Sequence, residues 1–233
     1  MVVTPAMGRE YNLLAMGARG DDHRHRLGGV GTALVCDVLD ELGVRSSFLG
    51  ADIRPLWPGD VVAGIAVTLA CRPADQIADE PYGTLFRALA EPRDGSVLVI
   101  AAGDQRSGVW GELLSVAARA RGVAGIVTDG LVRDRAAIGE LGFPVHARGV
   151  SPLDSAGRQD FAELDVPARF GDVEVRSGDW ILADELGAVV IPDALVDQVI
   201  ELAELKASGE RTVRSELEAG HDLGDVFRRH GIL

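Results

Sequence analysis

The stretch from residue 95 to residue 150 constrains the fold most, because strand-like and helix-like segments alternate along it. It opens with a nearly continuous apolar run, Gly95–Gly103, which is typical of a strand buried on both faces. Four segments are expected to follow: a helix over about 110–121, a strand over 125–130, a short helix over 134–142 and a strand over 144–148. This β-α-β-α-β order predicts right-handed crossovers and a parallel sheet, and therefore the α/β fold class.

The regions on either side of this core are predicted to contain both helices and strands. The expected elements are a helix capped by Thr32 and ending near Gly43, a strand over 60–71, mostly helical structure over 74–91, short strands between 168 and 192, and a long helix over 193–219 with a possible break at Gly209. The predicted organisation is an irregular N-terminal segment (1–28), one domain (29–192), and a C-terminal helix and tail (193–233) that contact other subunits.

Charge and composition exclude several classes of protein. A net charge of −13 argues against binding to nucleic acid or to anionic lipid, both of which need clustered cations. The sequence has one lysine, Lys206, in a charged helical segment, so an imine-forming enzyme is not expected. Cys36 and Cys71 are expected to be buried free thiols. No apolar run is long enough to span a membrane and no clean signal peptide is present, so a cytoplasmic enzyme is expected.

Arg133 and Asp134 follow a strand that ends at a glycine, where ligands bind in open α/β sheets. The fork of Arg133 matches a carboxylate or a 2-oxo acid, although a surface salt bridge to Glu112, Asp134 or Glu140 is the alternative. Asp134 is a candidate ligand for Mg²⁺ or Mn²⁺, and a helix N-cap is its alternative role.

A second candidate segment, Gly111-Glu112-Leu113-Leu114, opens a helix after a glycine-rich loop. Free backbone amides and the helix dipole favour a bound anion at such a position. Glu112 is a candidate acid or base, and its alternative role is favourable charge in the first helical turn.

Other polar residues are weaker candidates. His23 and His25 could bind a metal, although a solvated polar turn is favoured. His146 and Arg148 could line a distal substrate pocket, with core packing and a surface salt bridge as alternatives. Asp129 is expected to contact and support Arg133 without touching the ligand itself.

Three segments together resemble the RraA-like family, which includes the aldolases of 4-hydroxy-4-methyl-2-oxoglutarate and 4-carboxy-4-hydroxy-2-oxoadipate. The similar segments are Gly111–Asp134, Leu141–Pro152 and Ser177–Pro192. The resemblance covers most of the chain from Gly29 onward and implies a swivelling β/β/α domain with a long C-terminal helix that assembles as trimers or hexamers.

The resemblance also implies roles for individual residues. Arg133 would bind the oxo-carboxylate, Asp134 would coordinate the metal, and Gly111–Leu114 would bind the carboxylate through backbone amides. Glu112 would position a metal-bound water. A glutamate from a neighbouring subunit's C-terminal helix contributes in the family, and Glu210 matches it best, with Glu204 as the alternative.

These features predict an aldolase that uses Mg²⁺ or Mn²⁺, without a catalytic lysine, to release pyruvate from 4-hydroxy-2-oxo acids. Decarboxylation of oxaloacetate is an expected side activity because it needs the same enolate. The regulators of ribonuclease activity in the family tend to lack the aspartate that matches Asp134, so its presence favours the enzyme. A non-catalytic regulator, or a lyase or hydrolase acting on another oxo acid, is the alternative.

Overall fold

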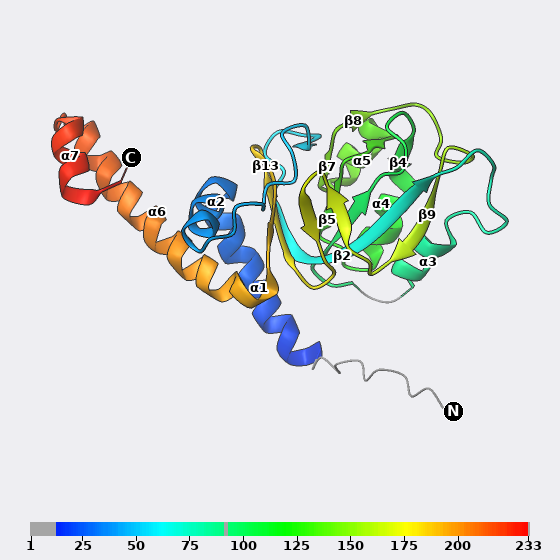
Figure 1. Ribbon diagram of the computed structural model, residues 1–233, viewed down its shortest axis with the longest axis horizontal. Coiled ribbons are helices and arrows are strands. Elements are labelled where there is room, and N and C mark those ends of the chain that lie inside the picture. The colour runs from blue at the N-terminus through cyan, green and yellow to red at the C-terminus, as the bar shows by residue number, and fades with distance from the viewer. Residues whose placement is uncertain (1–12, 91–92, 233) are drawn as a thin grey trace.

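A long, nearly closed sheet organises the computed structural model, which describes residues 13–90 and 93–232 (Figure 1). Its parallel part runs from β2 (Val62–Pro73) through β3 (Ser96–Ala101) and β5 (Gly125–Thr128) to β7 (Val145–Ala147). The sequence predicts each of these four strands, and the α/β fold class is confirmed.

Antiparallel strands extend the sheet on both sides. On one side of β2 lie β12 (Trp180–Asp184) and β13 (Gly187–Ile191), and the far end of β2 pairs with β9 (Gln159–Leu164). On the other side, β1 (Arg54–Pro55) pairs with β7. Arg54 Nη1 then donates to the carbonyl of Leu186 at 2.8 Å, beside β13, so the two edges approach each other.

Two apolar layers sandwich the parallel strands. On one face, helices α3 (Gly83–Ala88), α4 (Glu112–Ala120) and α5 (Arg135–Leu141) bury residues such as Ala118 and Ile138 against Leu98 and Ile126. On the other face, the hairpin of β10 (Ala168–Phe170) and β11 (Val173–Val175) packs on a second cluster. Coverage of both faces explains why the strands are continuously apolar.

Helices form a third layer and an arm. The layer contains α1 (Leu13–Val30), α2 (Thr32–Glu41) and α6 (Val196–Glu218), which follows a 3₁₀ turn (Asp193–Leu195). Figure 1 shows α6 reaching far from the sheet, with α7 (Leu223–His230) folded at its outer end. Within the described residues, no helix is both long enough and apolar enough to cross a membrane.

The structure corrects several expectations at the chain ends. Residues 13–28 are helical rather than irregular, because Leu27 of this helix is fully buried in one apolar cluster with residues of α2 and α6; residues 1–12 lie outside the described part. The C-terminal tail contains α7, and α6 continues through Gly209, where a Cβ would meet Ile232 at 2.6 Å.

Two further expectations about helices are also wrong: the mostly helical structure over 74–91 and the capping role of Thr32. Between 74 and 90 only Gly83–Ala88 is helical. The N-cap of α2 is Gly31, so Thr32 is the first helical residue. The carboxylate of Asp184 on β12 caps this helix instead, because it accepts the Thr32 amide at 2.8 Å and the Thr32 hydroxyl at 2.7 Å.

A small second sheet lies beside α4 and α5 and has no counterpart in the sequence prediction. Its strands β4 (Gly108–Trp110), β6 (Leu131–Val132) and β8 (Gly149–Val150) are all parallel, with β6 in the middle. Their carboxyl ends therefore meet at one edge of this sheet.

Candidate functional site

The three strands of the small sheet deliver the polar residues of one cavity. Strand β4 leads into Gly111 and Glu112, β6 leads into Arg133 and Asp134, and the chain beyond β8 reaches Asp154. The backbone of Arg133 is tied to the neighbouring strand by a hydrogen bond from its amide to the Trp110 carbonyl at 2.8 Å. Strand register thus sets the relative positions of residues that lie far apart in sequence.

Arg133 crosses directly over Gly108. A Cβ at Gly108 would lie 2.4 Å from Cγ of Arg133, so only glycine leaves room for this side chain. Nη1 of Arg133 donates to Oδ2 of Asp154 at 2.5 Å. The expected alternative partners Glu112, Asp134 and Glu140 are not the ones used.

Asp154 is a site residue that the sequence prediction missed. Its Oδ1 accepts the Tyr82 hydroxyl at 3.1 Å and the Ala156 amide at 2.9 Å. The Ala156 amide, with Tyr82 and Arg133, holds the pKa of Asp154 below its ordinary value, so this carboxylate is ionised at neutral pH. The hydrogen bond that the Asp154 carboxylate accepts from the amide two residues later is a local turn pattern typical of aspartate. This pattern is the one feature of the sequence that could have drawn attention to Asp154.

Asp134 adopts a left-handed backbone conformation, with φ of 54°. Such strain is uncommon outside glycine and concentrates at functional sites. Its side chain does not cap its own helix; Oδ2 instead accepts the Glu112 amide at 3.2 Å, across the start of α4. A Cβ at Gly111 would lie 2.8 Å from the same oxygen, so Gly111 makes room for the carboxylate.

The start of α4 offers further donors to the cavity. In the part of the chain that is described, the first-turn amides of Leu113 and Leu114 have no protein acceptor. With the helix dipole they favour a bound anion. The side chain of Glu112 lies at the same helix end and lines the cavity.

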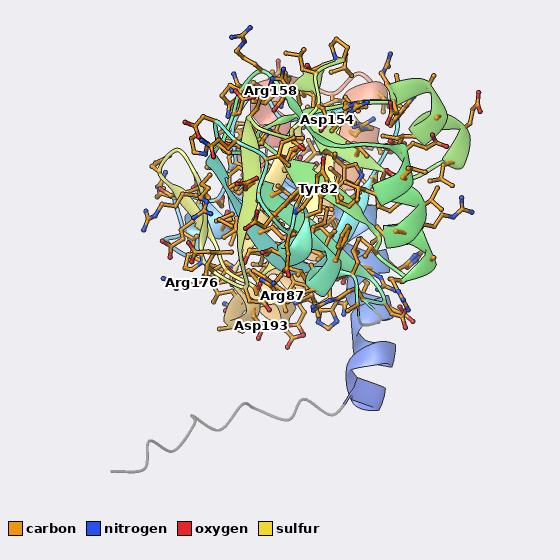
Figure 2. All side chains as sticks on the ribbon, turned by 90° about the vertical axis from the view of Figure 1, so that its right-hand side faces the viewer. Tyr82, Arg87, Asp154, Arg158, Arg176 and Asp193 are labelled. Carbon is orange, nitrogen blue, oxygen red and sulfur yellow. The ribbon has the colours of Figure 1, made fainter. Side chains whose placement is uncertain are left out.

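The cavity has a volume of about 370 Å³ and one largely apolar wall. Figure 2 looks onto this end of the molecule and shows Tyr82 near its centre, with Asp154 above it. The wall consists of Tyr82, Phe86, Trp110, Leu113 and Leu114. Phe86 and Leu113 remain 59% and 79% exposed, so apolar surface continues onto the rim.

The donor set of the cavity fits a hard divalent cation. Its ionisable oxygen donors are the carboxylates of Glu112, Asp134 and Asp154. No cluster of three or more metal-ligating side chains occurs among the described residues. A cation would therefore be held by one or two carboxylates and would take water or substrate oxygens for its other positions, as Mg²⁺ commonly does.

Three predicted supporting residues lie outside the cavity lining. Asp129 accepts the Ala102 amide at 2.7 Å and has no hydrogen bond to Arg133 in the described chain. Arg148 pairs with Asp52 at 2.6 Å. His146 is fully buried in β7, where desolvation lowers its pKa to about 4. His146 therefore packs in the core and Arg148 forms a surface salt bridge, which are the alternatives given for them in the sequence analysis.

The C-terminal candidates also lie away from the cavity within one chain. Glu210 is exposed on α6, and Figure 1 shows that helix at the opposite end of the molecule from α3 and β4. Glu204 pairs with Arg26 through two hydrogen bonds of 2.8 Å. A role for either glutamate requires a second copy of the chain.

The remaining candidates have structural roles. His23 is buried on α1, stacked on Trp180 with a centroid distance of 5.2 Å and bonded to Asp197 at 2.6 Å, so the predicted polar turn is wrong. Hydrogen bonding to Glu41 raises the pKa of Lys206, which opposes a role as a nucleophilic amine. Cys36 and Cys71 are free and partly buried, and burial raises the pKa of Cys71 to about 12.

The sheet and the cavity together define an α/β domain whose candidate ligand site lies at the carboxyl ends of parallel strands. The chain belongs to the RraA-like family, whose model, described as Aldolase/RraA, matches residues 32–190.

Individual relatives carry two kinds of description. A protein of Halalkalibacterium halodurans named "Putative 4-hydroxy-4-methyl-2-oxoglutarate aldolase" is 32% identical over 180 residues, which are 77% of this chain and 80% of the relative. The crystal structure of Streptomyces coelicolor RraAS2, described as an unusual member of the RNase ES inhibitor RraA protein family, has a TM-score of 0.74 and 33% identity, and the match covers 83% of this chain and 96% of that one. The RNA-processing inhibitor RraA from Thermus thermophilis has a TM-score of 0.55 and 28% identity, with 68% and 92% covered.

Proposed function

We propose that this protein is a lyase that uses Mg²⁺ or Mn²⁺ to cleave 4-hydroxy-2-oxo acids, such as 4-hydroxy-4-methyl-2-oxoglutarate, with release of pyruvate. The observation that carries this proposal is the convergence of Arg133, Asp134 and the start of α4 on one cavity. The aldolase name of the Halalkalibacterium relative supports the same reaction.

Each residue has a defined task in this reaction. Arg133 binds the substrate carboxylate, and the amides of Leu113 and Leu114 add neutral donors to it. Asp134 holds the cation, which when bound supplies Lewis-acid stabilisation of the charge that develops on the 2-oxo oxygen. The C3–C4 bond breaks, and its electron pair remains on C3 of the C1–C3 fragment, which becomes pyruvate. Glu112 takes the proton of the 4-hydroxyl, directly or through water. That proton then returns to C3.

A coupled assay for pyruvate tests the proposal. The expected result is steady release of pyruvate from 4-hydroxy-4-methyl-2-oxoglutarate, loss of release with a chelator, and recovery with added Mg²⁺ or Mn²⁺. Oxaloacetate should also be decarboxylated. A rate that chelation leaves unchanged contradicts the metal-dependent reaction.

A regulator of ribonuclease activity is the second candidate, because one structural relative is described as an RNA-processing inhibitor and another as an unusual member of the RNase ES inhibitor RraA family. The same assay separates the candidates. A protein that releases no pyruvate from a panel of 4-hydroxy-2-oxo acids at any metal concentration, yet slows a purified ribonuclease, would be the regulator. A panel that yields other products would point to a different lyase or hydrolase.

A further inference from the structure

The guanidinium group of Arg133 is bound by the protein through only one of its three nitrogens in the described part of the chain. Nη1 donates to Asp154, whereas Nε and Nη2 have no hydrogen-bond partner in the described part of the chain. A free arginine side chain loses considerable rotamer entropy when it is ordered. A contact that orders it before a ligand arrives therefore favours binding by lowering that cost.

Asp154 is itself fixed from three directions. Its Oδ1 accepts both the Tyr82 hydroxyl and the Ala156 amide, and its backbone bridges to Gly108, the glycine that Arg133 crosses. Figure 2 shows Asp154 and Tyr82 on the same face of the molecule. The carboxylate therefore occupies a defined place beside the arginine.

Tyr82 is anchored in turn. It is the N-cap residue of α3 with a left-handed φ of 67°, and its ring lies 6.2 Å from that of Phe161. Two of the three non-glycine residues with positive φ in the described chain, Tyr82 and Asp134, thus line this one cavity. Backbone strain of this kind persists only where the surroundings enforce it.

We propose that Asp154 is a positioning residue, which holds Arg133 through Nη1 so that Nε and Nη2 remain available as a fork for the substrate carboxylate. This inference rests on the proposed function, because it needs Arg133 to bind that carboxylate. Asp154 uses one oxygen for Arg133 and the other for Tyr82 and Ala156. Substrate can therefore bind the open edge of Arg133 without displacing Asp154.

Asp154→Asn separates this role from the local turn. The amide oxygen still accepts from Ala156 and Tyr82, but the amide nitrogen then faces Nη1 of Arg133, a donor against a donor. The expected result is a KM for the oxo acid about tenfold higher with kcat within about twofold, because a ground-state contact is loosened. Tyr82→Phe, which frees one side of Asp154, should raise KM by about threefold.

A mutant cycle shows whether Asp154 acts through Arg133. In an Arg133→Ala background, Asp154→Asn should change kcat/KM by less than about twofold, because nothing is left to position. The same tenfold loss in both backgrounds would mean that Asp154 only supports the local fold, and the positioning role would be overturned.

Asp52→Asn is the matched control, since Asp52 forms a similar exposed pair with Arg148 outside the cavity lining. It should leave KM within about twofold of the parent, as isolated surface pairs contribute little. If the parent protein releases pyruvate and Asp154→Asn has an unchanged or lower KM, the positioning role alone fails. If the parent releases none, the proposed function fails and this inference fails with it.

Discussion

Single residues shape the cavity partly through what they lack. Gly108 and Gly111 have no Cβ at the two points where Arg133 and Asp134 need the space. Arg133 and Asp134 were recognisable from the sequence because a forked cation and a carboxylate lie three and four residues after Gly130, the glycine that ends a predicted strand. Asp154 was not, because its partners Arg133 and Tyr82 lie 21 and 72 residues away, and only the fold brings them together.

Gly108→Ala should disable the site without unfolding the protein. The new Cβ would lie 2.4 Å from Cγ of Arg133, so the side chain must leave its position. Displacement of a binding group by about 1 Å can lower activity about 100-fold, and kcat/KM is expected to fall by about that factor. Gly29→Ala is the control, because nothing lies within 4 Å of its added Cβ. Equal activity of the two variants would contradict the steric argument.

At the scale of elements, Asp184 ties α2 to the main sheet. Its carboxylate accepts the amide and the hydroxyl of Thr32 and the amide of Leu186. Asp184→Ala is expected to lower the free energy of unfolding by about 2 kcal/mol, the loss of a helix cap with charge-assisted bonds. Urea denaturation measures this. Thr32→Ser keeps the hydroxyl and should change stability by less than about 0.5 kcal/mol, and a similar loss in both variants would argue against the cap.

Elements were predictable where the pattern extends over several residues. The buried strand over Ser96–Ala101 and the helix over Glu112–Ala120 were expected because their apolar runs and spacing are long enough to read. Strands β4, β6 and β8 have two or three residues each and carry no periodicity, so the sheet that builds the site was missed. Helix α1 was missed because its stability comes from packing against α6 and the main sheet rather than from local preference.

For the molecule as a whole, His146 makes stability depend on pH. Burial lowers its pKa to about 4, below the ordinary value of 6.5. The unfolded chain therefore binds the proton more readily, and this residue destabilises the fold as pH falls from about 6.5 toward 4. The loss can reach about 3 kcal/mol.

His146→Gln should remove this contribution. From pH 7 to pH 4.5, the free energy of unfolding should fall less, or rise more, in the variant than in the parent. The comparison between proteins is needed because burial raises the pKa of Asp60, Asp129 and Asp179, whose titration acts in the opposite direction. Equal pH dependence of the two proteins would contradict the assignment.

The arm formed by α6 and α7 bears on assembly. Leu205, Leu223 and Phe227 are 69%, 51% and 45% exposed along it, and Glu210 lies on it far from its own cavity. We propose that the chain forms trimers or hexamers in which Glu210 approaches the cavity of a neighbouring copy. Sedimentation should give a trimeric or hexameric mass, and Glu210→Ala should lower kcat; a stable, fully active monomer would contradict the proposal.

The central claim is that the cavity at the ends of β4, β6 and β8 performs metal-dependent release of pyruvate. Its most direct test is the rate of pyruvate formation from 4-hydroxy-4-methyl-2-oxoglutarate by the parent protein and by Asp134→Ala, each titrated with Mg²⁺ up to saturation of the parent. The account predicts a metal-dependent rate for the parent and no recovery of Asp134→Ala at any concentration. Full activity of Asp134→Ala at saturating metal would contradict it.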